Sequence, residues 1–200
     1  MAYIHALSPE PPQLRIDNVP GERLQPTIGA EAASLLQVLI AAHRPKLVLE
    51  IGTSLGYSAI AIGRAAASYG GHVISVESNA RLADAARQNV AAESLEATVR
   101  IETADASQFI RNVKGPLGLI LQDGGKEQYV PMLDGLVELL EPNGLLVSDD
   151  VLFPVMQLPP QVKHWADAMD AYNHALKNHR RLRTIWLPIG DGVAISVKVE

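Results

Sequence analysis

Short runs of branched apolar residues alternate with longer segments of helical spacing along most of the chain. The apolar runs have the length and composition of strands buried on both faces, and they lie at 47–51, 73–76, 98–102, 117–121 and 145–148. The segments between and around them predict helices at 29–43, 57–68, 79–92, from Asp105, up to Leu140 and at 161–178. Strands that alternate with helices predict right-handed crossovers and a mostly parallel sheet with helices on both faces.

The pattern changes near the C-terminus, where two strands follow one another at 182–188 and 193–199. Gly190-Asp191-Gly192 between them is a turn signal, so these strands predict an antiparallel hairpin. The expected fold class is therefore α/β and Rossmann-like, with a seven-stranded, mostly parallel sheet that ends in this hairpin. The dinucleotide-binding fold lacks such a terminal hairpin.

The first 26 residues differ in composition from the rest. Prolines crowd residues 8–26, and each of them removes a backbone donor, so this stretch cannot form a continuous helix or a central strand. We expect a proline-rich arm at 1–26 and a single domain at 27–200. The arm is predicted to be a lid near the ligand or a contact with a second subunit, and a disordered tail is the alternative.

Composition excludes several classes of protein. The chain has no cysteine, which excludes disulfides, thiolate zinc sites and cysteine nucleophiles. A net charge of -5 argues against a general nucleic-acid binder, which usually carries a basic face. No signal peptide and no apolar stretch of about 18 residues is present, so we expect a soluble cytoplasmic protein without a membrane segment.

The stretch from Leu47 to Ser58 is the most informative motif. A buried strand carries Glu50 near its end, and a loop with Gly52 and Gly56 then leads into a helix. The spacing is E-x-G-x-x-x-G rather than the G-x-G-x-x-G of dinucleotide-binding proteins, and no G-K-[ST] follows it. It resembles the first motif of class I S-adenosylmethionine-dependent methyltransferases, whose ligand has no phosphate. The alternative is an ordinary strand-to-helix turn that needs glycine for its dihedral angles.

Acidic residues follow the next two predicted strands. Glu77 comes directly after the strand at 73–76, where a carboxylate can accept hydrogen bonds from both ribose hydroxyls of a nucleoside. Asp105 follows the third strand, where it can accept from the exocyclic amine of adenine or cap the helix that starts there. The sequence does not separate these two roles.

Three further carboxylates follow two later strands: Asp123 after the strand at 117–121, and Asp149 with Asp150 after the strand at 145–148. In a parallel sheet these ends lie at the same carboxyl edge as Gly52, where ligands bind. Carboxylates that meet there repel one another, and a hard divalent cation such as Mg²⁺, which takes oxygen ligands, relieves the repulsion. The alternative is that one or two of them cap helices or accept from backbone amides.

With these motifs the chain resembles, from about Thr27 to its end, the metal-dependent O-methyltransferases that include catechol and caffeoyl-CoA O-methyltransferases and small bacterial relatives. The segments that carry the resemblance are Glu50 to Ser58, Glu77, Asp123 with Lys126 to Tyr129, Asp149 to Leu152, and Leu187 to Gly192. The resemblance implies the class I methyltransferase fold, a homodimer, S-adenosylmethionine as cofactor and a divalent cation, with Mg²⁺ first and Ca²⁺ or Mn²⁺ as alternatives.

The resemblance also implies roles for individual residues. Lys126 lies beside the reacting hydroxyl, where it can accept the proton or stabilise the phenolate as a cation, and the sequence does not separate these roles. The metal ligands are Asp123, Asp149 and Asp150. The residues expected to bind the cofactor are Ile28, Glu50, Gly52, Thr53, Gly56, Tyr57, Ser58, Glu77, Asp105, Ala106 and Asp123.

Two positions depart from the family pattern. The metal-binding pair is usually Asp-Asn, but here it is Asp149-Asp150, and the second acid that usually precedes the lysine is replaced by Gly125. The expected function is methyl transfer to a hydroxyl of a small catechol-like or phenolic acceptor, assisted by a divalent metal. Two alternatives stay open: methylation of a hydroxylated uridine in transfer RNA, and cofactor binding with lost or altered catalysis. A dehydrogenase is disfavoured by the missing third glycine.

Residues that select the acceptor are expected in the proline-rich arm and in the segment 153–165. Phe153 and Trp165 can stack on an aromatic ring, or they can be ordinary packing residues.

Overall fold

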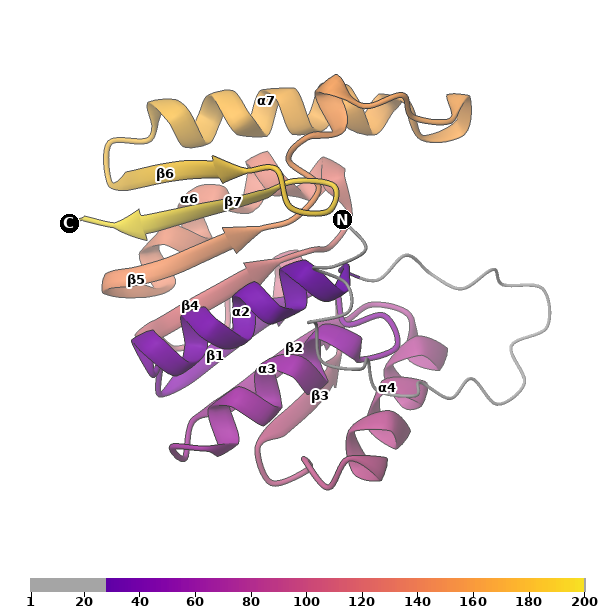
Figure 1. Ribbon diagram of the computed structural model, residues 1–200, viewed down its shortest axis with the longest axis vertical. Coiled ribbons are helices and arrows are strands. Elements are labelled where there is room, and N and C mark those ends of the chain that lie inside the picture. Colours follow the sequence, from indigo (N-terminus) through magenta and orange to yellow (C-terminus); the bar gives the residue numbers. More distant parts are fainter. Residues whose placement is uncertain (1–27, 200) are drawn as a thin grey trace.

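A computed structural model describes residues 28–199 of the protein, and the proline-rich arm predicted at 1–26 lies outside these residues. One seven-stranded sheet has the order β3-β2-β1-β4-β5-β7-β6, with β7 antiparallel to both of its neighbours and the other pairs parallel (Figure 1). The strands are β1 (Leu47–Ile51), β2 (His72–Glu77), β3 (Val99–Thr103), β4 (Leu117–Gln122), β5 (Leu140–Ser148), β6 (Leu182–Leu187) and β7 (Val193–Lys198). The predicted fold class and the terminal hairpin are confirmed.

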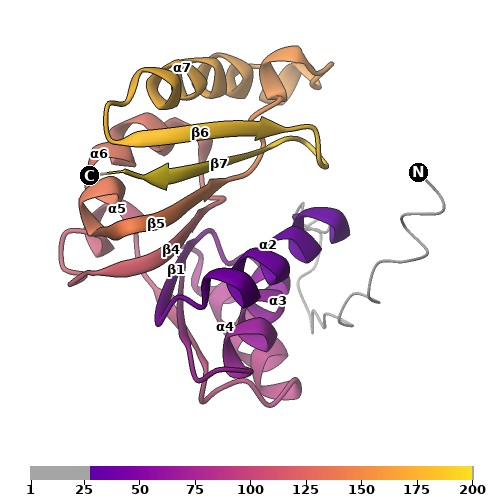
Figure 2. The same cartoon turned by 60° about the vertical axis from the view of Figure 1, so that its left-hand side comes forward.

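Helices cover both faces of the sheet (Figures 1 and 2). On one face lie α2 (Ala30–His43), α3 (Tyr57–Ala67) and α4 (Ala80–Ala92), and on the other lie α6 (Tyr129–Leu139) and α7 (His164–Asn178). Every residue of β4 is buried, as expected for a central strand with helices on both sides. The short elements are α5 (Ala106–Phe109), η1 (Lys126–Gln128), η2 (Phe153–Val155) and η3 (Pro160–Val162).

Two element boundaries differ from the predicted ones by three residues or more. β5 begins at Leu140 rather than 145, because Leu140 pairs with Leu117 and the register of β4 and β5 then shifts between Leu117 and Leu119. The helix predicted from 161 begins at His164. Before it the chain forms the separate 3-10 turn of η3, with Pro160 at its first position.

Backbone hydrogen bonds continue past the strand ends and fix the loops that follow. Gly52 N–H donates to Val76 O (3.0 Å), Asp123 N–H to Ile51 O (2.9 Å), and Asp149 N–H to Gln122 O (3.2 Å). The loops after β1, β4 and β5 are therefore held side by side at the carboxyl edge of the sheet. Within residues 28–199, none of the helices has the length and apolar character that crossing a membrane requires.

Candidate functional site

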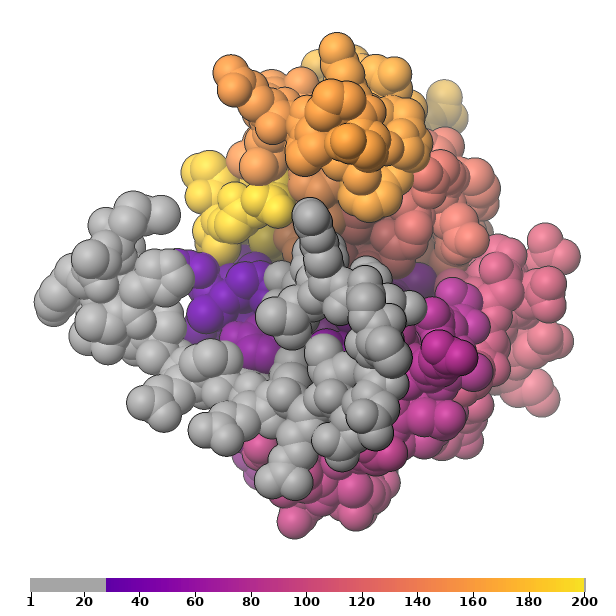
Figure 3. Space-filling model, turned by 90° about the vertical axis from the view of Figure 1, so that its right-hand side faces the viewer, coloured from indigo at the N-terminus to yellow at the C-terminus, as the bar shows by residue number. Residues whose placement is uncertain are grey.

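A cavity of about 500 Å³ opens at the carboxyl edge of the sheet. Figure 3 looks onto this edge, with the segment around residues 150–165 (orange) above and the indigo and magenta helices below. The residues predicted for the site that line the cavity are Ile28, Gly52, Glu77, Asp105, Ala106, Asp123, Lys126, Asp149 and Asp150. Segments far apart in the sequence thus contribute to one cavity.

The other predicted cofactor residues lie behind the cavity wall and do not line it: Glu50, Thr53, Gly56, Tyr57 and Ser58. All five are buried. The hydroxyls of Thr53 and Ser75 are 2.5 Å apart, and Ser75 donates to the Glu50 carboxylate. Burial raises the pKa of Glu50 to about 7, and the nearby Ser58 and Ser75 hydroxyls only partly counter this effect.

The glycines of the loop after β1 are required by packing within the protein. Gly52 has φ +94°, and a Cβ there would lie 2.2 Å from the backbone oxygen of Asp123. Gly56 has φ +88°, and a Cβ there would lie 3.3 Å from Ala86 Cβ in α4. Only glycine accepts both the left-handed backbone and the close approach at Gly52. The glycine at position 52 therefore lets the loops after β1 and β4 meet.

Glu77 lies at the end of β2 and is held by backbone donors. Its carboxylate accepts from Ser54 N–H (2.9 Å) and Asn79 N–H (2.8 Å). Ser54 also lines the cavity, and its buried hydroxyl oxygen has no hydrogen-bond partner among residues 28–199. A buried hydroxyl without a partner is costly unless a ligand or water satisfies it. Sequence reasoning missed Ser54, because a serine between two glycines of a turn carries no separate signal.

Asp105 caps α5 and lines the cavity, so the two roles left open by the sequence are compatible. Its carboxylate accepts from the Ser107 hydroxyl (2.5 Å) and from Gln108 N–H (3.0 Å). These bonds, first that of Ser107 and then that of Gln108, lower the pKa of Asp105. The carboxylate is therefore ionised at neutral pH.

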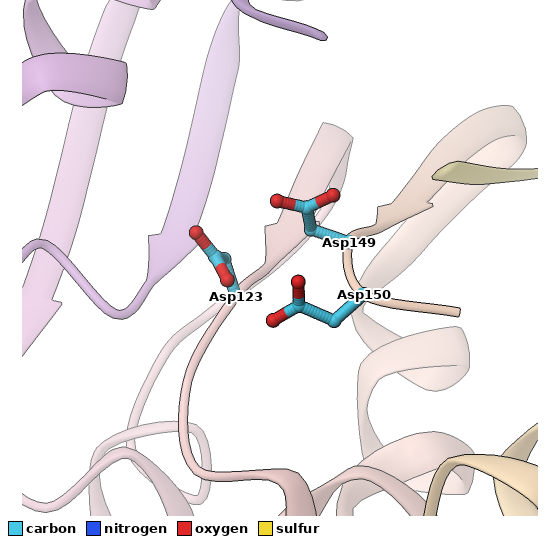
Figure 4. A group of neighbouring side chains, drawn as sticks. All are labelled: Asp123, Asp149 and Asp150. Atoms are coloured by element: carbon cyan, nitrogen blue, oxygen red, sulfur yellow. The ribbon is translucent and has the colours of Figure 1, made fainter. Parts of the chain in front are cut away.

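Three carboxylates converge at the ends of β4 and β5 (Figure 4). Asp123, Asp149 and Asp150 each offer an oxygen, and these oxygens all lie within 4.8 Å of one another. Their donor set consists of hard oxygen ligands from two strand ends, and this set fits a hard divalent cation.

The pKa values within this acidic cluster also favour a bound cation. Burial, together with the charges of Asp123 and Asp150, raises the pKa of Asp149 to about 8. Burial also raises the pKa of Asp123 to about 6, against the opposing effect of Lys126. Negative charge held this close together without full compensation is the situation that a bound cation relieves.

Lys126 is buried beside the cluster. Its Nζ lies 2.5 Å from Asp150 Oδ2, 3.2 Å from Asp123 Oδ1 and 3.1 Å from the Tyr129 hydroxyl oxygen. Burial opposes the charge of the ammonium, but Tyr129 and the two aspartates outweigh it and raise the pKa well above the usual range. An ammonium has three N–H donors, so these acceptors satisfy all of them.

The backbone of Asp150 is left-handed, with φ 64°. Aspartate and asparagine tolerate this conformation better than other residues with a Cβ. The segment directly after Asp150 is held by the turn between β6 and β7. Val151 N–H donates to Gly192 O (3.1 Å), and Leu152 N–H donates to Asp191 O (3.0 Å). Asp191 also lines the cavity, which the sequence presented only as part of a turn.

An aromatic pair forms another part of the cavity wall. The rings of Phe153 and Trp165 are stacked, with centroids 6.2 Å apart and planes at 10°. Trp165 Nε1 donates to Glu127 Oε1 (3.1 Å), and His164 Nε2 lies 3.3 Å from the same oxygen. The two residues therefore pack on one another and also face the space beside the acidic cluster.

Several known proteins are similar to this chain in sequence. Residues 13–199 match the family model described as O-methyltransferase. The O-methyltransferase ankF of Aspergillus thermomutatus is 27% identical over 185 residues, which cover 84% of this chain and 77% of that protein. The catechol O-methyltransferase of Niastella koreensis is 29% identical over 63% of this chain and 58% of its own length. Caffeoyl-CoA O-methyltransferase 2 of Populus trichocarpa is 24% identical over 87% of this chain and 75% of its own length.

Solved structures share the fold. The O-methyltransferase from Bacillus cereus in complex with SAH, the demethylated cofactor, superposes with a TM-score of 0.75 at 22% identity, covering 90% of this chain and 84% of that one. The SAH-bound methyltransferase PaMTH1 of Podospora anserina gives a TM-score of 0.78 at 22% identity, covering 84% and 78%. At this identity the likeness concerns the fold.

Proposed function

The chain belongs to the O-methyltransferase family, and we propose that this S-adenosylmethionine-dependent enzyme methylates a hydroxyl of a small catechol-like or phenolic acceptor with the help of a divalent cation. The observation that carries the proposal is the convergence of Asp123, Asp149 and Asp150 with Lys126 at one end of the cavity. The loop after β1 and Glu77 lie on the same cavity, as a donor site beside the acidic cluster requires.

The residues that would hold the cofactor fall into two groups. Glu77 and Asp105 present carboxylates to the cavity for the ribose hydroxyls and the adenine amine, and Ser54 offers an unpartnered hydroxyl between them and Gly52. Glu50, Thr53 and Ser58 act from behind the wall, where their hydrogen bonds fix the end of β1 and the start of α3. Ile28 and Ala106 would add apolar surface, and the buried Tyr57 would support the wall from behind.

Asp123, Asp149 and Asp150 would hold the cation, with Mg²⁺ as the first choice because all the ligands are carboxylate oxygens. A bound divalent cation supplies Lewis acidity and a fixed position for the acceptor oxygen. A phenol has a pKa of about 10, so it needs such assistance to react as the anion at neutral pH. Vicinal hydroxyls on an aromatic ring offer two oxygens to one cation, which favours catechols.

Lys126 would act as a fixed positive charge beside the acceptor oxygen. Its ammonium donates to three acceptors and its pKa is raised, so it holds its proton at neutral pH. While it holds its proton, the lysine stabilises the phenolate as a cation. The proton of the acceptor would then leave to solvent.

Phe153 and Trp165 would form the apolar wall on which the acceptor ring packs. The relatives named catechol and caffeoyl-CoA O-methyltransferase support an aromatic acceptor of this kind. The alternative acceptor, a hydroxylated uridine in transfer RNA, has no support from the relatives. The homodimer and the cytoplasmic location stay predictions.

A single assay tests the proposal. Purified protein, S-adenosylmethionine and Mg²⁺ are incubated with catechol, with resorcinol as the matched diol whose oxygens cannot share one cation, and with bulk transfer RNA. We expect methylated catechol, little methylated resorcinol, and a loss of activity in EDTA that added Mg²⁺ reverses. Asp123→Ala should abolish the reaction. Full activity in chelator would remove the metal from the proposal, and tight cofactor binding without methylation of any phenol would favour the non-catalytic alternative.

A further inference from the structure

A buried phenol connects Lys126 to the strand ends that carry the acidic cluster. Tyr129 has no exposed surface and lies at the first position of α6. Its hydroxyl accepts from Lys126 Nζ (3.1 Å) and donates to the backbone oxygen of Gln122 (2.9 Å). The backbone oxygen of Asp149 lies 3.5 Å from the same hydroxyl. The phenol therefore touches the residue before Asp123 and the backbone of Asp149 itself.

From this arrangement we propose that Tyr129 is a positioning residue that holds one N–H of Lys126 and so limits how far the ammonium enters the acidic cluster. The proposal rests on the proposed function, because it assigns Lys126 and the cluster their roles in it. Tyr129 acts through Lys126 and is not itself in contact with the acceptor. Its hydroxyl gives the ammonium a neutral partner on the side of the sheet.

The need for such an anchor follows from the other contacts of Lys126. Both of its remaining partners, Asp123 Oδ1 and Asp150 Oδ2, are carboxylates of the cluster. Opposite charges with little solvent around them attract strongly, so the ammonium is drawn toward the oxygens that would bind the cation. The Tyr129 hydroxyl opposes this shift by taking one N–H, and its own position is fixed by the carbonyl of Gln122.

Loss of this hydroxyl has two expected consequences. The N–H of Lys126 then loses its neutral side-chain acceptor, so we expect the ammonium to move further between Asp123 and Asp150 and to compete with the cation. Metal affinity therefore falls. The charge beside the acceptor oxygen is also misplaced, which lowers kcat and leaves the KM for S-adenosylmethionine unchanged.

The chain offers a matched control in Tyr172. This tyrosine is also fully buried, and its ring meets that of Tyr129 edge-on at 4.9 Å. Its hydroxyl bonds to Ser148 Oγ (2.7 Å) and Gln122 Oε1 (3.0 Å) and makes no contact with Lys126. Tyr172→Phe therefore removes a buried hydroxyl of the same type without touching the lysine.

The test is titration of Mg²⁺ into the metal-free protein by calorimetry. We expect Tyr129→Phe to weaken Mg²⁺ binding about 10- to 100-fold, the range found when residues that orient metal ligands are lost. Tyr172→Phe should stay within about twofold of the unaltered protein, since it does not change the ligand set. In a Lys126→Met background, Tyr129→Phe should have no effect on the affinity, because the residue through which it acts is gone.

The outcomes separate this proposal from the proposed function. Unaltered protein that binds no divalent cation would overturn both. Normal Mg²⁺ binding by Tyr129→Phe, or the same loss in the Lys126→Met background, would overturn the positioning role alone. A second measurement needs no variant: the Lys126 ammonium should give a slowly exchanging ¹⁵N signal with cross-relaxation to the Tyr129 ring protons. Absence of that cross-relaxation would overturn the proposal even if Tyr129→Phe did not fold.

Discussion

Lys126 and Asp150 form an ion pair of 2.5 Å within the acidic cluster. Asp150 occupies the position at which the family pattern has an asparagine, so it brings an additional carboxylate to the site. The ammonium of Lys126 lies against this carboxylate rather than midway between the aspartates, since its distance to Asp123 is 3.2 Å. The extra charge at position 150 is therefore compensated inside the protein.

Asp150→Asn should retain activity within about tenfold of the unaltered enzyme at saturating Mg²⁺, because an amide oxygen is also a ligand for hard cations. Asparagine also tolerates the left-handed backbone at this position, where φ is 64°. Asp150→Ala lacks the oxygen and strains the backbone by about 1–2 kcal/mol, so its activity and stability should both fall. Initial rates and urea unfolding measure the two effects. Equal inactivity of both variants would show that the negative charge itself is needed.

Two glycines of the site should respond oppositely to alanine. Gly125→Ala is expected to stabilise the protein by about 0.4–1 kcal/mol, because the change reduces the freedom of the unfolded chain. The backbone at Gly125 has φ -60°, and a Cβ would meet only Glu127 Oε2 at 3.6 Å. Gly52→Ala should be strongly destabilising, because its Cβ would lie 2.2 Å from the Asp123 backbone.

Urea unfolding of the two glycine variants at one pH measures the difference. A stabilised Gly125→Ala would show that the backbone at position 125 accepts a residue with a Cβ. The glycine in place of the usual acid before Lys126 is then not required by the backbone conformation. A destabilised Gly125→Ala would contradict this interpretation.

Glu50 should make the stability of the metal-free protein depend on pH. Burial, with a smaller effect from the Asp123 charge, raises its pKa in the folded protein from the usual 4.5 to about 7, so the folded state holds the proton more tightly than the unfolded chain. Stability from this group is therefore greatest below about pH 4.5 and falls as the pH rises toward 7. Glu50→Gln removes this pH dependence. The free energy of unfolding of the variant, relative to that of the unaltered protein, should therefore increase by about 2–3 kcal/mol between pH 5 and pH 8.

Urea unfolding of both proteins at a series of pH values provides the measurement for Glu50. The pKa values of Asp123 and Asp149 are also raised, and the part of their effect that does not depend on the Glu50 charge cancels in the difference. A difference that did not vary with pH would mean that Glu50 is ionised and compensated in the folded state.

Trp165→Ala should raise the KM for an aromatic acceptor about 2- to 10-fold, corresponding to the loss of an aromatic contact of about 0.5–1.5 kcal/mol. The affinity for S-adenosylmethionine should not change, because Trp165 and Phe153 lie beside the acidic cluster. Trp165→Phe keeps a ring and serves as the matched control, with a smaller effect. Steady-state kinetics with catechol as the varied substrate gives the answer. An unchanged KM in Trp165→Ala would make the stacked pair a packing feature only.

The order of strands and helices was determined by the sequence, because apolar periodicity reflects which faces of each element are buried. The same local signals placed the acidic cluster, since Asp123 and Asp149 directly follow buried strands whose carboxyl ends share an edge in a parallel sheet. The start of β5 was predicted wrongly because Glu141 to Gly144 has the composition of a turn, while its pairing with β4 depends on the neighbouring strand.

Only the tertiary structure decided how the side chains of the site are paired. Several features of the site join segments that are separate in the sequence. Lys126 contacts Asp150, the β6–β7 turn bonds to the backbone of Leu152, and Glu50 is buried behind the cavity wall. Lys126 also contacts Tyr129 at the start of α6. Such contacts depend on the distance and direction between elements after packing. A linear pattern records which residue follows a strand, but it does not record which oxygen an ammonium meets across the sheet edge.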